Sequence, residues 1–199
     1  MEPNSIEQTA TDLAKIANFR LHAENLAIPI LDGFTVEQDE NPQVILLATG
    51  HGIVEQLVSD GPIKDSKFED RISLVIENTK QFMRNNNCRD VDQSFIFYKD
   101  YNNGTFNFKI YFQDMVLPQQ KAIRNIIAYF VEPRMHDFYQ FSLSAGPFQM
   151  PTELLKLGTI DLDNDQVTSM LSNLMQNLLD SLSYKDAVVE TEPETPVAN

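Results

Sequence analysis

Hydrophobic and polar residues alternate on both sides of the dipeptide Asn103-Gly104. Apolar side chains stand mostly at every second position: Phe95, Phe97, Tyr101, Phe106, Phe108, Ile110 and Phe112. Such alternation is typical of strands with one buried face, and Asn-Gly is the preferred centre of a two-residue type I′ turn. The pattern predicts a β-hairpin over residues 93–101 and 105–116, in which Tyr101 pairs with Phe106. Its aromatic face should be buried, and the opposite face, with Ile96, Tyr98 and Gln113, should meet water wholly or in part.

Two more alternating segments follow the hairpin. Residues 123–131 place Ile126, Ala128 and Phe130 on one side and Ile127, Tyr129 and Val131 on the other, and then Tyr139, Phe141 and Leu143 alternate with Phe138, Gln140 and Ser142. Because neighbouring strands along a chain usually pair, the four strands predict an antiparallel meander. Earlier extended segments are predicted at residues 19–23, 34–36, 44–49 and 53–58. The run 44–48 is apolar throughout, which indicates a strand covered from both sides.

Three segments show the spacing of amphipathic helices. The stripe over residues 67–84 contains Phe68, Ile72, Val75, Ile76, Thr79 and Phe82; it begins at a capping box of Ser66 and Glu69 and ends at Asn85-Asn86-Asn87. The stripe over residues 164–183 contains Val167, Leu171, Leu174, Leu178 and Leu182. A third helix is predicted over residues 5–18, after the capping box of Ser5 and Gln8.

These elements define an α+β fold, an antiparallel β-meander of four or more strands covered on one face by the amphipathic helices 67–84 and 164–183. Residues 1–184 are predicted to form a single domain. Residues 185–199 hold Glu190, Glu192 and Glu194 with two prolines and few core-forming residues, which predicts a disordered acidic tail.

Charge and cysteine content restrict the classes of partner. The chain of 199 residues carries a formal net charge of −14, which opposes binding to nucleic-acid phosphates and to anionic membranes. Cys88 is the only cysteine, so an intramolecular disulfide is excluded. No run approaches the roughly twenty apolar residues that span a bilayer. These properties predict a cytoplasmic protein.

Acidic residues at alternate positions resemble a calcium loop only in part. Asp161, Asp163 and Asp165 have the required spacing, but Gln166 and Ser172 stand where such a loop needs Gly and Glu. The three acids are therefore interpreted as stabilising the N-terminus of the following helix.

The histidines are His22, His51 and His136, in separate segments. Glu132 and His136 are four residues apart, but Pro133 excludes the helix that would place both on one zinc-binding face. The Gly50-His51-Gly52 sequence favours a tight turn between strands over an anion-binding turn.

Other reactive residues show no catalytic pattern. Ser142 or Ser144 can be combined with His136 and Asp137, but no nucleophile elbow is present and strand geometry separates these side chains. Cys88 is followed by Arg89 but also by Asp90 and Asp92, which predicts an inert thiol. Lys121, Arg124 and Arg134 are interpreted as solvated strand ends rather than an anion clamp.

The sequence therefore predicts no catalytic residue, metal or cofactor, and it leaves a ligand-binding site unassigned. We expect a non-catalytic protein-interaction domain of the chaperone, adaptor or inhibitor type, whose partner is another protein or a second copy. The alternative is a small-molecule-binding domain or an enzyme with a pocket between the sheet and the C-terminal helix, where Met170 and Met175 would adapt to an irregular cavity.

Overall fold

The computed structural model describes residues 16–23, 25–64, 67–118, 121–149 and 166–185. The helices are α2 (Phe68–Asn85) and α3 (Gln166–Ser181), with a 3₁₀ turn η2 (Val91–Gln93). The strands are β1 (Ile16–Ala23), β2 (Leu26–Leu31), β3 (Thr35–Val36), β4 (Val44–Gly50), β5 (Ile53–Pro62), β6 (Phe95–Asn102), β7 (Asn107–Val116), β8 (Lys121–Val131), β9 (Asp137–Gln149) and β10 (Ser183–Tyr184).

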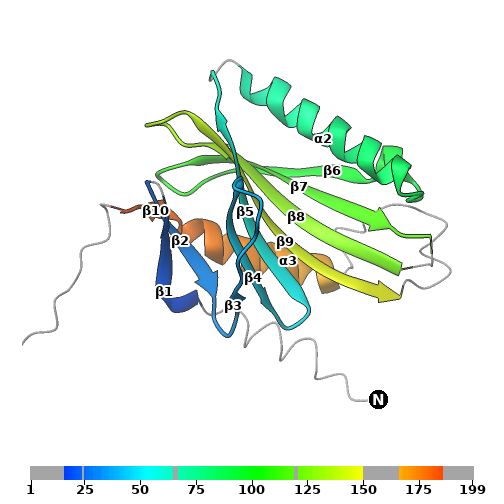
Figure 1. Ribbon diagram of the computed structural model, residues 1–199, viewed down its shortest axis with the longest axis horizontal. Helices are drawn as coiled ribbons and strands as arrows, with labels where there is room; N and C mark the ends of the chain where they lie inside the picture. Colours follow the sequence, from blue (N-terminus) through cyan, green and yellow to red (C-terminus); the bar gives the residue numbers. More distant parts are fainter. Residues whose placement is uncertain (1–15, 24, 65–66, 119–120, 150–165, 186–199) are drawn as a thin grey trace, which may run out of the picture.

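The strands form two antiparallel sheets in the described part of the chain (Figure 1). The larger has seven strands in the order β3-β4-β5-β9-β8-β7-β6, and the smaller has three in the order β1-β2-β10. The predicted meander is confirmed, because β6, β7, β8 and β9 pair in chain order. The α+β class is confirmed with it. Strand β5 pairs with β9, and β4 and β3 follow in turn, so these three strands extend the sheet beyond the meander.

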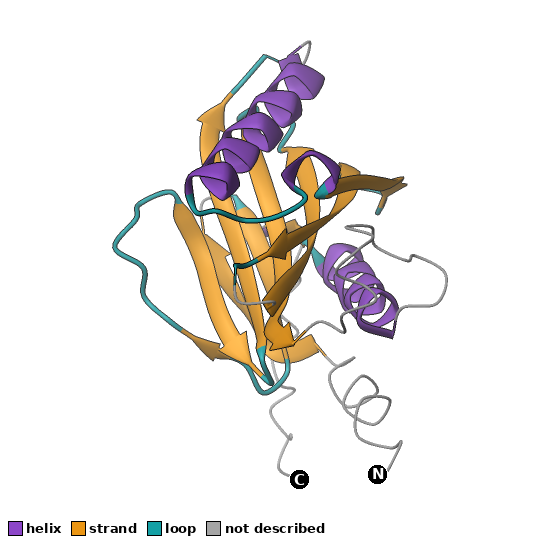
Figure 2. Ribbon diagram, turned by 90° about the vertical axis from the view of Figure 1, so that its right-hand side faces the viewer, coloured by secondary structure: helices purple, strands orange, loops and turns teal. Residues whose placement is uncertain are grey.

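The two helices pack on opposite faces of the large sheet, whereas the sequence analysis placed them on one face (Figure 2). Helix α3 and strand β2 bury Leu171, Leu178 and Ile28 with the inward row Ile126, Ala128 and Phe130. Helix α2 packs Ile72 against the other row, Ile127 and Tyr129. The error has a physical cause: β8 is apolar on both sides, so each of its faces needs its own cover.

The hairpin exists, but its predicted register and turn are wrong. Asn102 pairs with Asn107 and Tyr101 with Phe108, so the loop covers residues 103–106 and is longer by two residues. Gly104 has a positive φ of 90° and Asn103 does not. Instead, the Asn103 side chain forms the turn: its Oδ1 accepts the N–H groups of Thr105 and Phe106, and its Nδ2 donates to Leu179 O of α3. A side-chain turn therefore replaces the type I′ backbone turn.

A β-bulge at Tyr98 changes which side chains of β6 face the core. The pairing shifts by one residue between Phe97 and Lys99, which reverses the faces of all residues before the bulge. Ile96 and Tyr98 consequently pack against the main core, whereas the predicted core residue Phe97 is 48% exposed. Phe95 packs on the α2 side. The inward face of β7 follows the prediction, with Phe108, Ile110 and Phe112 buried.

Strand β2 was not among the predicted segments, and it contains Pro29. All six of its residues are buried. Strand β10 pairs only with Leu26 and Ala27 of β2. Pro29 therefore has a neighbouring strand, β1, on one side only, and no backbone N–H donor is needed from it on the other side. Residues 5–15 of the predicted helix 5–18 lie outside the described residues. Its last three residues belong to β1, because pairing with β2 overrides the local helical spacing.

Two finer expectations also need correction. Strand β4 is buried on one face only, at Leu46 and Ala48, because no helix of the described residues packs on its other face. In α2 the buried residue of the last turn is Met83, not Phe82, which is 58% exposed. The helix ends at the predicted asparagines, but Lys67 is its N-cap and makes no capping side-chain bond.

A buried ion pair connects the large sheet to α3. The Arg124 guanidinium donates to both carboxylate oxygens of Asp114, at 2.7 Å from Nε and 2.8 Å from Nη2, and Nη1 donates to Thr168 Oγ1 at 2.9 Å. Both charged side chains are 5% exposed. Bidentate geometry and a third acceptor satisfy charges that would otherwise be costly to bury.

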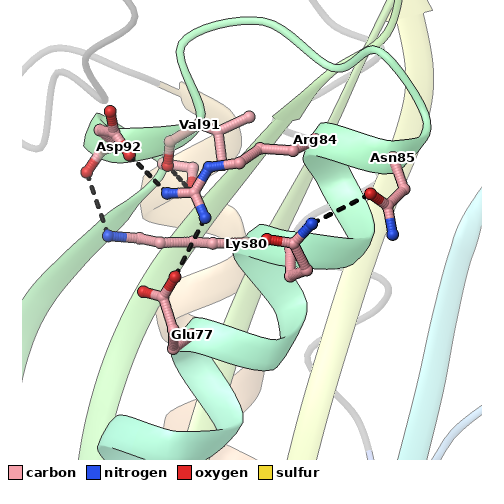
Figure 3. A network of polar contacts seen from close by, with 8 residues as sticks. Glu77, Lys80, Arg84, Asn85, Val91 and Asp92 are labelled. Carbon is pink, nitrogen blue, oxygen red and sulfur yellow. Dashed lines mark hydrogen bonds and ion pairs between the residues drawn. The ribbon is translucent and has the colours of Figure 1, made fainter.

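A second, exposed network connects α2 to η2 (Figure 3). Arg84 donates to Glu77 at 3.0 Å and to Asp92 at 2.7 Å, and Lys80 Nζ donates to Asp92 O. The exposed fractions of the three charged side chains of the Arg84 pairs lie between 39% and 85%, so solvent screens these pairs and each contributes little to stability.

We expect Arg124→Ala to lower the free energy of unfolding by about 3 to 5 kcal/mol, because Asp114 then keeps a buried charge without its partner. The matched control Arg84→Ala should cost less than about 1 kcal/mol. Urea unfolding followed by tyrosine fluorescence suits a chain without Trp. Equal losses for the two variants would show that the Arg124 pair does not anchor α3.

Candidate functional site

Half of one face of the large sheet has no helix packed on it in the described part of the chain. Helix α2 lies over β8, β7 and β6 on this side (Figure 1), where Ile72 and Ile76 belong to one cluster with Tyr129, and its Phe68 packs on Phe138 at the start of β9. The outward residues of β4, β5 and β9 are half-buried and form what we call the open face: Leu47, Thr49, Val54, Gln56, Val58, Gln140, Ser142 and Ser144.

The open face is continuous across the three strands. Val54 pairs with Ser144 and Thr49, Gln56 with Ser142 and Leu47, and Val58 with Gln140. The inward residues between them, such as Ile53, Leu57 and Phe141, are buried in the main core. The alternation of the strands therefore separates a packed inner side from a solvent-accessible outer side.

Two large apolar side chains of α2 are exposed. Leu74 is 49% exposed and Phe82 is 58% exposed, although both are large and apolar. They are eight residues apart on the helix, so they lie near the same side of it. Arg71, also on this side, forms an ion pair with Asp60 of β5 at 3.2 Å.

A crevice runs between this side of α2 and strands β5 and β9. One part, of about 260 Å³, is lined by Asp60, Arg71, Leu74, Val75, Asn78, Thr79 and Gln140. The adjoining part, of about 310 Å³, shares Arg71 and Leu74 and adds Ile63, Lys64, Lys67 and Asp70. The crevice joins the open face at Gln140, so the two form one surface, which we call the docking surface.

The open face is unusual in its lack of charge. All eight positions of the open face are uncharged, although 44 of the 199 residues of the chain are charged. In the crevice, Asp60 and Asp70 are each paired with a cation. The cores of protein interfaces are depleted of charged residues in the same way, because each unpaired charge would lose its hydration on binding.

A second pair of hollows lies at the N-terminal end of α2. The larger, about 410 Å³, is lined by Phe68, Asp100, Tyr101, Asn102, Asn107, Phe108 and Lys109. The smaller, about 290 Å³, shares Phe68 and Asn107 and adds Val131, Pro133 and His136. Lys109 is neutralised there by Glu69 at 3.1 Å and Asp100 at 2.9 Å.

The histidines singled out in the sequence lie in turns. His51 occupies the turn between β4 and β5 with a φ of 53°, and His136 precedes β9 with a φ of 60°, so the predicted tight turn at His51 is confirmed. Glu132 accepts the N–H groups of Arg134 and Met135 and stabilises its own turn rather than a metal. No group of three or more metal-binding side chains occurs among the described residues; the His22 side chain is not described.

The candidate nucleophiles are not brought together with a base. Ser142 and Ser144 lie on the open face, and six residues of extended strand, about 20 Å, separate Ser142 from His136. Burial raises the pKa of the Cys88 thiol, so the thiol form is favoured over the reactive thiolate.

The three cations singled out in the sequence are separated. Arg124 is buried with Asp114, Lys121 begins β8, and Arg134 follows its end and stacks 3.6 Å over the Tyr184 ring. The interpretation of Arg124 as a solvated strand end was wrong. Asp161, Asp163 and Asp165 and the tail 186–199 lie outside the described residues.

The space between α3 and the sheet is occupied by core side chains. Met175 is fully buried in the main cluster and Met170 packs against it. The four hollows described above have no α3 residue among their linings. The hollows described here lie around α2, and the pocket expected beside the C-terminal helix stays a prediction.

Sequence reasoning missed the docking surface, although one signal for it was present. Positions 54, 56 and 58 and positions 140, 142 and 144 are uncharged at alternate places in two strands. Only the pairing of β5 with β9 makes these positions neighbours. The exposure of Leu74 and Phe82 depends on where α2 sits over the sheet, which helical spacing does not specify.

Comparison with known proteins shows the class of fold. No family model and no curated protein matches the sequence. Among solved structures, the chain is similar to the Saccharomyces cerevisiae Ran-binding protein Mog1p and to a mutant of protein Mog1. Each has a TM-score of 0.58 and 6% identity, and each alignment covers 85% of this chain and 95% of the other. The chain thus shares an α+β fold with Mog1. No described helix is long and apolar enough to cross a membrane.

We expect Phe82→Ala to change the free energy of unfolding by less than about 1 kcal/mol, because the ring is largely in solvent. The adjacent control Met83→Ala should cost about 2 to 5 kcal/mol, because it leaves a cavity under α2. Urea titrations of both variants measure the difference. A Phe82→Ala loss as large as that of Met83→Ala would place the ring in the core rather than in solvent.

Proposed function

We propose that this chain is a non-catalytic protein-binding domain of the cytoplasm, and that its partner binds the docking surface. One observation carries the proposal: an uncharged sheet face continues at Gln140 into a crevice lined by the exposed Leu74. Exposed apolar patches rimmed by polar residues are typical of protein-binding sites. The polar side chains of the face, Gln56, Gln140, Ser142 and Ser144, supply hydrogen bonds without the desolvation cost of a full charge.

The shared fold supports a protein as the partner. Mog1p of S. cerevisiae is a Ran-binding protein, and Ran is therefore the first defined partner to test against this chain. Because the likeness is one of fold, the proposal itself rests on the docking surface and extends to any folded partner with a complementary uncharged face.

A small-molecule-binding role is the second candidate. It is favoured by the hollow of about 410 Å³ at the end of α2, where Phe68, Tyr101 and Phe108 offer rings and Asn102 and Asn107 offer amides. Ligand sites commonly combine apolar walls of this volume with a few polar groups. The two functions use different residues, because the hollow and the crevice share no lining residue, so substitutions can separate them.

The test of the proposed function uses a photo-crosslinking residue placed in the full-length protein at Gln56, at Ser142, or at the exposed loop residue Thr105. We expect the first two positions to form an adduct with the same partner in cells, and the Thr105 control to form none. Positions 56 and 142 are paired neighbours on the same face of β5 and β9, so a partner bound to this face should contact both.

Charge substitutions then measure the affinity for that partner, or for purified Ran, by calorimetry. Gln56→Lys with Ser142→Lys should weaken binding at least about tenfold, since two charges would be buried without partners. Thr105→Lys adds charge outside the surface and should leave binding unchanged. Wild-type affinity in the double variant would contradict the proposal, and loss of binding on Phe68→Ala alone would favour the hollow instead.

A further inference from the structure

Glu55 is a carboxyl group in the main core. It lies on β5 between Ile53 and Leu57, on the inward side, and it is 0% exposed. Its neighbours across the sheet are Ala48 of β4 and Leu143 of β9, which are both fully buried. Unpaired acidic residues are almost never buried in this way, because a carboxylate loses its hydration there.

The carboxyl group accepts one hydrogen bond and has one oxygen without a partner. Oε2 accepts the backbone N–H of Leu31 at 3.1 Å, and Oε1 is buried without a hydrogen-bond partner. Burial raises the pKa of Glu55 to about 8, and the bond from Leu31 lowers it by less. Glu55 is therefore mostly neutral at pH 7 in the folded protein.

Leu31 belongs to the corner where the chain leaves the small sheet for the large one. We call residues 31–34 the corner; Phe34 N–H donates to Leu31 O at 3.2 Å and closes it. The Phe34 ring fills the space over Gly50, where a Cβ would come within 2.7 Å of it, and lies 6.2 Å from the His51 ring. Glu55 holds the corner from inside the core, and the β4–β5 turn holds it from outside.

We propose that Glu55 is a proton-dependent contact that keeps the corner closed: in its neutral form it binds Leu31 inside the core, and loss of its proton opens the corner and the adjoining end of β2. The group is the one described carboxyl that is fully enclosed without a cation or a second donor. The proposal is independent of the proposed function.

The direction of the pH effect follows from the two states of the corner. In the open state Glu55 meets water and ionises near its ordinary pKa of 4.5, whereas in the closed state it ionises near 8. Opening therefore releases a proton between these values. Below pH 4.5 the closed state keeps its full stability, and from pH 4.5 to 8 the ratio of open to closed corner rises up to about tenfold per pH unit.

Other titratable groups do not produce the same dependence. The described side chains beside Glu55 on β4 and β9 are apolar, and no charge contributes to the shift of its pKa. Asp32 of the corner and His51 of the β4–β5 turn are exposed, so neither is buried with the carboxyl group. The titration of the corner is thus assigned to Glu55.

Amide hydrogen exchange of the full-length protein between pH 5.5 and 7.5 tests the proposal. In the EX2 regime the logarithm of the exchange rate rises with pH with a slope of one, from base catalysis alone. The Leu31 amide should show a slope of about two, since proton release by Glu55 adds a second tenfold factor per pH unit. The Ile76 amide of α2 serves as the internal control and should keep a slope of one.

The variant Glu55→Gln keeps the shape of the side chain and an acceptor for Leu31 but cannot titrate, so its Leu31 slope should return to one. The slope measured at Leu31 in the wild-type protein tests the proposal even if the variant does not fold. A slope of one at Leu31 in the wild-type protein, or a slope of two that persists in Glu55→Gln, overturns the proposal. The proposal is also overturned if the Leu31 amide exchanges only by global unfolding. In that case its free energy of opening equals the free energy of unfolding measured in urea.

Discussion

A row of aromatic rings across the large sheet is the interaction on which the rest of the structure depends. Phe108, Phe130 and Tyr139 are direct cross-strand neighbours on β7, β8 and β9. Their ring centroids are 5.2 Å and 5.1 Å apart, and the last two rings are stacked at 17°. Contacts of this kind add to the large apolar area that each ring buries. Helix α3 and the small sheet are needed to keep water from this row.

The opposite face of the same sheet is covered to a lesser extent. Strand β8 is apolar on both sides, so α2 must lie over it, but one helix is only about 10 to 12 Å wide and leaves the outer strands uncovered. The uncovered outer sides of β5 and β9 carry serine, glutamine and valine. The position of the single helix leaves this face uncovered, and the lack of charge on the open face suits it to binding another protein.

Asp114 and Glu55 are two buried acids with different partners. Asp114 forms an ion pair with Arg124, which donates to both of its oxygens, and the pair also connects the sheet to α3. Glu55 has one backbone donor and no cation, so burial holds it in the neutral form. A low-dielectric interior favours either a complete ion pair or no charge, and this fold contains both solutions.

The sequence by itself determined the elements whose signal is local: the meander β6–β9, helix α2 to within a residue, helix α3 and the inward face of β7. Alternation and helical spacing need only near neighbours to be informative. The tertiary structure decided the bulge at Tyr98, the burial of strand β2 despite Pro29, the placement of the helices on opposite faces, and the docking surface. Each of these depends on contacts between residues far apart in the chain, since pairing and cover are set by the partner strand or helix rather than by local composition.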